Sequence, residues 1–343
     1  MIAGSGFNSE HVLLLLRHTL GSWVFTSVIY ASLRLGGWYT SPLYQSLMVY
    51  TALLAAYSTW KRYQEKRIES LDYSEEVVLI TGGSGGVGWS LAQVLAFRGA
   101  DVITLDNKEP PSRYERNITS YLCDLTDPAQ IDKVTRQIIE KHGHVSILVN
   151  NAALVKPNLL TQANKDNILQ EFKVNTIAPI LMIQAFLPGM LRANHGHILT
   201  VGSILGSTGL AYGAGYCSSK AALIRVHESL LQELVHVHKT SKVHASCIIP
   251  GYINTPMFSD VVWNNPLTSF LLPKAETFEV AQDIVQVIDA QSSSTLYIPT
   301  MAWFSLFYPF LPLWMLNLLH WATSATTAFK LMIREKNEKV HTK

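Results

Sequence analysis

Two side chains one helical turn apart, Tyr216 and Lys220, have the types and the spacing for proton transfer. A free phenol has a pKa of about 10, which is too high for proton removal at neutral pH. A lysine four residues further along a helix lies on the same face, and its ammonium group stabilises a tyrosinate and lowers the pKa of the phenol. An isolated Tyr-Lys pair at this spacing usually lies on the protein surface and has no chemical role. Whether this pair transfers protons therefore depends on what the rest of the chain contains.

A glycine-rich loop lies where a predicted strand, Val77–Ile80, runs into a predicted helix. Its sequence is Thr-Gly-Gly-Ser-Gly-Gly-Val-Gly over residues 81–88. Glycines allow positive φ angles and let the main chain approach a pyrophosphate, and the free N–H groups of the helix start attract phosphate. At the head of an alternating domain the loop predicts a dinucleotide site, whereas alone it would also fit a flexible turn.

The second predicted strand ends at Asp106. A carboxylate at this position can accept hydrogen bonds from both ribose hydroxyls of the adenosine half, and it repels a 2′-phosphate. This favours NAD over NADP, although Lys108 lies close enough to weaken the preference. The alternative is an aspartate that only forms a turn before Asn107.

Short apolar runs alternate with longer helical stretches from Glu75 to about Ala290. The predicted strands are Val77–Ile80, Val102–Leu105, Ser146–Val149, His197–Val201, Val243–Ile249 and Leu296–Ile298, and the predicted helices include Trp89–Arg98, Pro128–His142, Phe172–Ala193 and Ser218–Val237. Such alternation predicts a parallel sheet with helices on both faces. We therefore expect an α/β fold with a single Rossmann-type, doubly wound parallel sheet over residues 72–295.

The middle of the chain, roughly residues 75–270, resembles the short-chain dehydrogenase/reductase family. The resemblance rests on the glycine loop, on Asn-Asn-Ala-Ala at 150–153 with Ala153 in place of the family's glycine, on Tyr-x-x-x-Lys at 216–220, and on Pro250-Gly251 with Thr255. It implies hydride transfer between a nicotinamide cofactor, NAD or NADP, and an alcohol or carbonyl group. The implied catalytic residues are Asn175, Ser203, Tyr216 and Lys220.

The resemblance also implies a role for each catalytic residue. Tyr216 is the acid/base, and Lys220 both stabilises the tyrosinate and binds the nicotinamide ribose. Ser203 holds the substrate oxygen, and Asn175 positions a water on a proton path to solvent. The expected cofactor-binding residues are Thr81, Gly82, Ser84, Gly85, Gly86, Val87, Gly88, Asp106, Asp124, Leu125, Asn151, Ala152, Tyr216, Lys220, Pro250, Gly251, Ile253 and Thr255.

Further phrases are similar to the membrane-bound branch of the family that contains retinol dehydrogenases and 17β-hydroxysteroid dehydrogenases. They are Tyr-Cys-Ser-Ser-Lys at 216–220, His-Glu-Ser-Leu at 227–230 and the segment 250–258. This similarity implies a lipophilic substrate such as a retinoid, a steroid or a long-chain lipid. The alternatives are an NADPH-dependent ketoreductase of lipid biosynthesis, of the 3-ketosphinganine or acyl-dihydroxyacetone-phosphate type, and a catalytically idle membrane scaffold.

Composition excludes several other classes of protein. The net charge is +2, so no strong field indicates nucleic acid. Charged residues make up 15% of the chain, against roughly 25% in average soluble proteins, and the deficit lies at the two ends. Three cysteines far apart exclude a disulfide framework, and the twelve histidines show no metal-binding spacing, so we expect no metal.

The N-terminal segment, residues 1–65, is predicted to be a membrane anchor of one or two hydrophobic helices. Leu35–Trp60 carries no formal charge and is long enough to cross a bilayer, and Lys61, Arg62, Lys66 and Arg67 follow it on what is then the cytosolic side. The shorter stretch Thr19–Leu33 is a second span, half of a hairpin or an interfacial helix. Helices buried in a soluble core are the alternative for both stretches.

The C-terminal segment, residues 296–343, is hydrophobic, interrupted by prolines and followed by a basic tail. Pro299, Pro309 and Pro312 argue against one straight helix over Leu296–Trp321. The segment is a monotopic element in one leaflet, a lipid-facing cover of the substrate mouth, or a buried cap. We expect the endoplasmic reticulum or a lipid droplet as the location, with the catalytic domain facing the cytosol, and a homodimer as the family's usual assembly.

An apolar lid is expected after the Pro250-Gly251 loop, in the place where the family carries its substrate lid. A hydrophobic helix pair that faces the core is the alternative. The expected lid residues are Phe258, Val261, Val262, Trp263, Leu267, Phe270, Leu271 and Leu272.

Overall fold

The computed structural model describes residues 9–35, 42–65, 71–112, 116–258, 270, 273–323, 326 and 329–330. The chain divides into two compact units, Met1–Ser70 and Leu71–Lys343. Each unit is described separately below.

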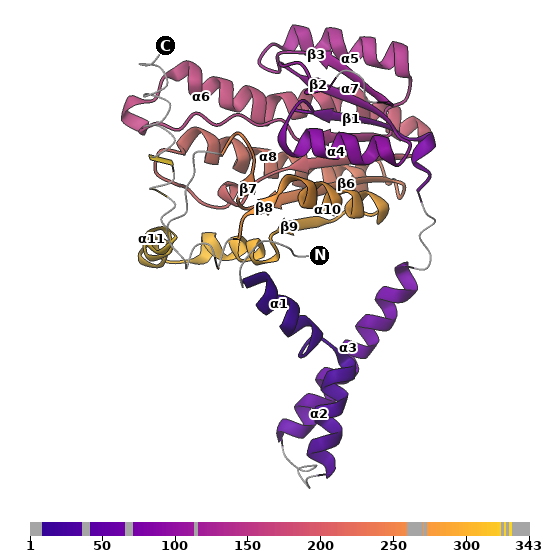
Figure 1. The fold of residues 1–343 in the computed structure, drawn as a ribbon, viewed down its shortest axis with the longest axis vertical. Coiled ribbons are helices and arrows are strands. Elements are labelled where there is room, and N and C mark those ends of the chain that lie inside the picture. The colour runs from indigo at the N-terminus through magenta and orange to yellow at the C-terminus, as the bar shows by residue number, and fades with distance from the viewer. Residues whose placement is uncertain are drawn as a thin grey trace. The chain divides into compact units, whose positions relative to one another are not determined.

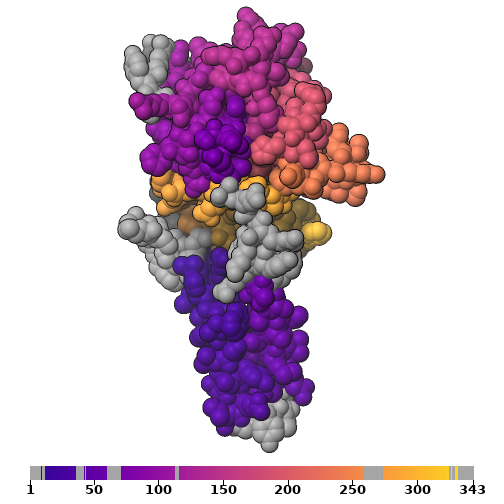
Figure 2. Space-filling model, turned by 90° about the vertical axis from the view of Figure 1, so that its right-hand side faces the viewer, coloured from indigo at the N-terminus to yellow at the C-terminus, as the bar shows by residue number. Residues whose placement is uncertain are grey.

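The first unit consists of three helices, α1 (Ser9–His18), α2 (Trp23–Leu35) and α3 (Pro42–Glu65). Figure 2 shows α2 and α3 side by side. The rings of Tyr30 and Tyr44 stack between them with centroids 4.6 Å apart, and the Tyr50 hydroxyl donates to the Leu20 carbonyl at 3.0 Å. These contacts hold α2 and α3 together as a pair.

The membrane span that we expected over Leu35–Trp60 is not confirmed. By length and composition, the run Lys165–Ala193 of the second unit meets the criterion for crossing a membrane, and so does the bent pair Val12–His18 with Trp23–Leu35, whereas α3 does not. Residues 36–41, with Trp38 and Tyr39, and the basic residues Lys66 and Arg67 lie outside the described part of the chain.

The second unit is built on a parallel sheet of seven strands in the order β3-β2-β1-β4-β5-β6-β9 (Figure 1). The strands are β1 (Val77–Thr81), β2 (Asp101–Asp106), β3 (Ile118–Leu122), β4 (Ile147–Asn150), β5 (Gly196–Val201), β6 (Val243–Pro250) and β9 (Thr295–Ile298). Central strands such as β4 and β5 are buried along their whole length, and each contains an apolar run, Ile147–Val149 in β4 and Ile198–Leu199 in β5. The strand order reverses between β1 and β4, and ligands bind at such a switch point.

Helices cover both faces of the sheet, which confirms the doubly wound fold predicted from the sequence. One core cluster lies under α4 (Gly86–Phe97) and α10 (Thr277–Asp289). The other lies under α5 (Pro128–His142), α7 (Ala178–Ala193) and α8 (Ala214–Gln232). A small parallel pair, β7 (Ile253–Asn254) and β8 (Ala275–Glu276), stands outside the main sheet.

Two predicted helices are interrupted by wider π-helical turns. The expected helix Phe172–Ala193 consists of α6 (Lys165–Phe172), the π turn η3 (Lys173–Ile177) and α7. The expected helix Ser218–Val237 consists of α8 and a second π turn, η5 (Glu233–Val237). Such turns occur often at functional sites, and η3 carries Asn175.

After β9 the chain forms the 3₁₀ helix η6 (Thr300–Phe310) and the helix α11 (Leu313–Ala322). Pro312 precedes the first residue of α11, so the chain breaks near the proline where the sequence predicted a break. Short 3₁₀ segments also occur at η1 (Tyr73–Glu75), η2 (Leu160–Gln162) and η4 (Ile204–Gly206).

Candidate active site

The predicted site residues gather at the carboxyl edge of the sheet. Thr81 ends β1, Asp106 ends β2 and Pro250 ends β6, while Asn151 and Ser203 follow β4 and β5. Since all these strands are parallel, their carboxyl ends meet at one edge. This is the edge at which open α/β sheets bind their ligands.

The glycine loop has the backbone geometry of a phosphate cradle. Gly82 and Gly86 have φ angles of +66° and +53°, which side chains other than glycine rarely adopt. A Cβ atom on Gly88 would collide with the Gly82 carbonyl oxygen and lie 2.7 Å from Asn151 Nδ2. The loop therefore packs closely against the start of α4, whose free N–H groups are available to an anion.

Hydrogen bonds among Thr81, Asn151 and Ala152 connect this loop to the segment after β4. Thr81 Oγ1 accepts the main-chain N–H groups of Asn151 and Ala152, both at 3.1 Å. Asn151 Nδ2 donates to the carbonyl oxygens of Thr81 and Gly82 at 3.0 and 3.2 Å. The side chains of Thr81 and Asn151 thus fix the geometry of the loop. The side chain of Val87 packs into the core, so Val87 can offer a ligand only its main chain.

Asp106, the residue predicted to bind the adenosine ribose, lies beside the glycine loop. Its Oδ2 atom accepts the Ser84 N–H at 3.0 Å, and its Oδ1 atom accepts the Lys108 N–H at 3.2 Å. Ser84 Oγ in turn donates to the Lys108 carbonyl at 2.8 Å. The carboxylate is thus oriented by the main chain on both sides.

Two other segments, residues 250–255 and Asp124 with Leu125, were also expected to bind the cofactor. A Cβ atom on Gly86 would lie 3.3 Å from Thr255 Cγ2, so the segment after Pro250 and Gly251 reaches the glycine loop, and Ile253 packs into the core next to it. The Asp124 carboxylate instead accepts the Thr126 N–H at 2.8 Å in a local turn. Leu125, the next residue, is buried in the second core cluster.

The four predicted catalytic residues are all buried. Tyr216 lies in the first turn of α8 and Lys220 in the second, and Ser203 follows β5. Ser203 lies near enough to Tyr216 to affect the pKa of its phenol, and Ser203 Oγ accepts the Leu205 N–H at 3.1 Å. Lys220 Nζ donates to the Val201 carbonyl at 2.7 Å. The structure therefore brings these three side chains to the end of β5.

Asn175 connects this group to the end of β4. Its Oδ1 atom accepts the Leu154 N–H at 2.7 Å, and its Nδ2 atom donates to the Leu154 carbonyl and to Ser219 Oγ, both at 2.9 Å. Both amide hydrogens are thus used within the protein. The water-positioning role of Asn175 stays a prediction, and the contacts described give it a bracing role between β4 and α8.

The pKa of Tyr216 is raised, whereas the sequence predicted that Lys220 lowers it. Burial is the main cause, because it disfavours the charged phenolate; the nearby Ser203 opposes the shift, and Cys217 and Glu171 add to it. Burial also lowers the pKa of Lys220 to about 8. Lys220 is not among the causes of the Tyr216 shift, so burial and not the helical spacing sets its direction.

An apolar cluster surrounds the phenol of Tyr216. Its buried members are Val155, Leu210, Tyr216, Cys217, Tyr252 and Phe329. The rings of Tyr216 and Phe258 meet edge to face with centroids 6.5 Å apart. Of the expected lid, Phe258 is thus placed next to Tyr216, while Val261, Val262, Trp263, Leu267, Leu271 and Leu272 lie outside the described residues.

Sequence reasoning missed two residues of this neighbourhood. Phe329, far along the chain, lies close to Gly213, since a Cβ atom there would be 3.3 Å from Phe329 Cε1. Glu171 on α6 is buried, its Oε1 atom accepts the Lys156 N–H at 2.8 Å, and it faces Gly215, where any side chain would collide with it. Phe329 follows no periodic pattern, and an acidic residue in a helix usually indicates an exposed face.

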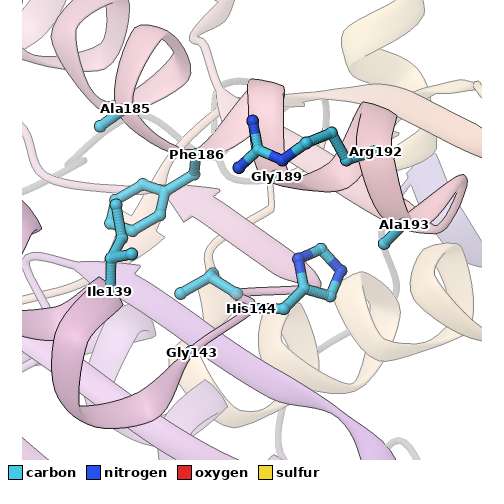
Figure 3. A pocket seen from close by; sticks show the side chains of 9 residues that line it. Ile139, Gly143, His144, Ala185, Phe186, Gly189, Arg192 and Ala193 are labelled. Atoms are coloured by element: carbon cyan, nitrogen blue, oxygen red, sulfur yellow. The ribbon is translucent and has the colours of Figure 1, made fainter.

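The cavity in Figure 3 is separate from this site. It has a volume of about 330 Å³ and lies between α5 and α7, where Phe186, Arg192 and His144 line it. His144 and Val145 precede β4, whereas the catalytic groups follow the strands. The cavity is therefore at the opposite edge of the sheet.

The fold and the site define a Rossmann-type oxidoreductase that binds a nicotinamide nucleotide. The short chain dehydrogenase family model matches residues 76–265, and the chain belongs to this family. It is an NAD(P)-dependent oxidoreductase that acts on CH–OH groups, as is usual in the family.

Several characterised proteins are similar to this chain. It is 33% identical to human 17-beta-hydroxysteroid dehydrogenase 13 over 233 residues, which cover 66% of this chain and 75% of that protein. It is 32% identical to human epidermal retinol dehydrogenase 2 over 248 residues, 69% of this chain and 79% of that protein. The ligand-free aldohexose dehydrogenase of Thermoplasma acidophilum has the same fold, with a TM-score of 0.58, 21% identity, and 67% and 94% of the two chains covered.

Replacing Gly88 by alanine should destabilise the second unit by about 1–3 kcal/mol, because the added methyl group meets the Gly82 main chain. Gly85 offers a matched control, since a Cβ atom there has no neighbour within 4 Å and its φ angle of −172° suits alanine. Gly85→Ala should change stability by less than about 1 kcal/mol. Thermal unfolding of the solubilised full chain measures both, and equal effects would contradict the packing.

Replacing Lys220 by methionine should give a stability difference that depends on pH. The pKa of Lys220 is lower in the folded chain, about 8, than its ordinary value of 10.5. Wild-type stability should therefore rise with pH between these values, because there the unfolded chain binds a proton that the folded chain does not. The variant lacks this rise, so the stability of wild type relative to the variant should increase by roughly 3 kcal/mol across this range. A difference that stays constant with pH, measured by denaturant unfolding, would show that Lys220 is solvated.

Proposed function

We propose that the chain is a membrane-anchored dehydrogenase for a lipophilic alcohol or carbonyl compound, with Tyr216 as the acid/base. The observation that carries this proposal is the burial of Tyr216 beside Ser203 and Lys220, inside an apolar cluster and next to the nucleotide cradle. Proton transfer and a water-poor substrate site thus coincide at one edge of the sheet.

The residues at this edge fit a nicotinamide dinucleotide. The backbone of residues 82–88 would hold the pyrophosphate, Asp106 the adenosine ribose, and Lys220 the nicotinamide ribose. The Asp106 carboxylate favours NAD over NADP, because a 2′-phosphate would meet a negative charge. When bound, the cofactor supplies or accepts the hydride.

The protein's own groups handle the proton. The Tyr216 phenol is protonated at neutral pH, as an ordinary tyrosine is, and can therefore serve as the proton donor to a carbonyl oxygen. Ser203 binds the same oxygen and stabilises the charge that develops on it. The Lys220 ammonium stabilises the tyrosinate that the donation leaves, and the reverse transfer serves alcohol oxidation.

The surroundings of Tyr216 support a retinoid, a steroid or a long-chain lipid as the substrate. Leu210, Tyr252, Phe258 and Phe329 offer apolar side chains and rings around the phenol. The names of the two human relatives, a hydroxysteroid dehydrogenase and a retinol dehydrogenase, agree with this class. A ketoreductase of lipid biosynthesis that uses NADPH is the second candidate, and Lys108, two residues after Asp106, supplies a positive charge for the 2′-phosphate of that cofactor.

We also propose that the N-terminal unit anchors the protein to the endoplasmic reticulum or to lipid droplets, with the second unit in the cytosol. Exposed apolar side chains on α2 and α3, such as Val28 and Leu53, support this. Homodimers would form through the helices that carry Asn175 and Tyr216, where Leu169 and Ile177 are exposed.

Tyr216→Phe should lower turnover by at least about 100-fold, because the substitution removes the proton donor. Nucleotide affinity should stay within a few-fold, since the phenol is not needed to hold the dinucleotide. Tyr73→Phe is the control, because Tyr73 is equally buried but binds Asp289 away from the site. Turnover is measured with the solubilised chain on retinoids, steroids and long-chain ketones, and an active Tyr216→Phe variant would remove Tyr216 from its role.

The dissociation constant for NADH should be at least about tenfold lower than that for NADPH, in keeping with a charge-assisted hydrogen bond to ribose. Asp106→Asn should reduce this ratio to a few-fold. Asp101→Asn, at the other end of β2, should leave it unchanged. Fluorescence titration of both reduced nucleotides measures the ratio, and tighter binding of NADPH by the wild type would favour the ketoreductase.

A further inference from the structure

The helix α11 is apolar on nearly every side, yet none of its residues is buried. Its sequence is Leu-Trp-Met-Leu-Asn-Leu-Leu-His-Trp-Ala, with two polar residues and no acidic or permanently charged one. Successive residues point about 100° apart, and Leu313, Trp314 and Met315 are all exposed. A helix that is hydrophobic all round is buried in protein or in a membrane, whereas the described residues cover this one only in part, at Leu316, Leu319 and Ala322.

The preceding 3₁₀ helix, η6, is fixed to the domain by one narrow side. Ala302 and Ser305 are buried and Tyr308 is partly buried, whereas Trp303, Phe304, Leu306, Phe307 and Phe310 are exposed. The rings of Trp303, Phe304 and Phe307 form a cluster, with centroids 4.4 Å apart for the first two. The exposed apolar side chains of η6 and α11, here named the C-terminal apolar surface, are Trp303, Phe304, Leu306, Phe307, Phe310, Leu313, Trp314, Met315, Leu318 and Trp321.

The chemistry of this surface favours lipid over a protein partner. Residues 290–329 contain no Asp, Glu, Lys or Arg, whereas protein interfaces have a polar rim. A protein partner would also cover one side of α11 and leave the others in water. Tryptophan is enriched where membranes meet water, and three tryptophans lie on the surface.

The size of α11 limits how it can enter a membrane. Ten residues extend about 15 Å, which is half of the hydrocarbon thickness of a bilayer. The helix is therefore too short to span and suits a single leaflet.

The same segment is joined to the active-site edge of the sheet. Gly251 donates its N–H to the Ile298 carbonyl at 2.6 Å, and Pro299 packs against Gly251 immediately before η6 begins. Figure 1 shows η6 and α11 following β9 beyond the edge of the sheet. A lipid layer that holds the C-terminal apolar surface would thus lie near the nucleotide loop.

We propose that the C-terminal apolar surface inserts into one leaflet of a phospholipid layer, as a membrane contact of the catalytic unit separate from the N-terminal helices. It brings the carboxyl edge of the sheet to the lipid, where a lipophilic substrate is concentrated. This last consequence rests on the proposed function, while the insertion itself does not.

Spin labels on the full chain in phosphatidylcholine nanodiscs test the insertion. Trp314→Cys and Leu318→Cys each place a nitroxide on α11, and Phe97→Cys, which replaces an exposed apolar residue at the end of α4, is the matched control. The three native cysteines are buried. Collision rates with oxygen, which concentrates in lipid, and with a water-soluble nickel chelate are measured for each label.

We expect the oxygen-to-nickel ratio to be several-fold higher at positions 314 and 318 than at 97. A ratio equal to that at position 97 would place α11 in water and overturn the proposal. A label shielded from both reagents would also overturn it, because protein would then cover the helix. No substrate is used, so a lack of turnover would count against the proposed function alone.

Discussion

The burial of an ammonium group beside a phenol is the constraint on which the site depends. Lys220 is 1% exposed and Tyr216 is 5% exposed, so neither side chain can be stabilised by bulk water. Desolvation raises the pKa of Tyr216 and lowers that of Lys220, and the Val201 carbonyl is the acceptor for the ammonium. Burial thus disfavours the charged form of both groups, and we expect a nucleotide bound at this edge of the sheet to change which forms are stable.

Contacts of two asparagines help to position Tyr216 and Lys220 and the glycine loop at the same end of the sheet. The π turn η3 places Asn175 where it can bind both Leu154 after β4 and Ser219 on α8. Asn151 fixes the glycine loop from the same end of β4. Asn175 thus supports the helix that carries Tyr216 and Lys220, and Asn151 supports the glycine loop.

Local sequence patterns predicted the central strands, the glycine loop and the Tyr-Lys pair, because each follows from a short run of residues. The edge strand β3 was not among the predicted ranges, since its side chains are only partly buried and form no continuous apolar run. The π turn at Asn175, the position of Phe329 and the raised pKa of Tyr216 could not be predicted. They arise from packing between segments far apart in the chain, and helical spacing alone does not report burial.

A structure of the full chain with bound nicotinamide nucleotide tests the central claim most directly. We predict that the Tyr216 hydroxyl faces the C4 carbon of the nicotinamide ring and that Lys220 Nζ exchanges its bond to Val201 for one to the ribose, or shares it. A Tyr216 hydroxyl that points away from C4, with Lys220 still bound only to Val201, would contradict the assignment of this pair to the chemistry.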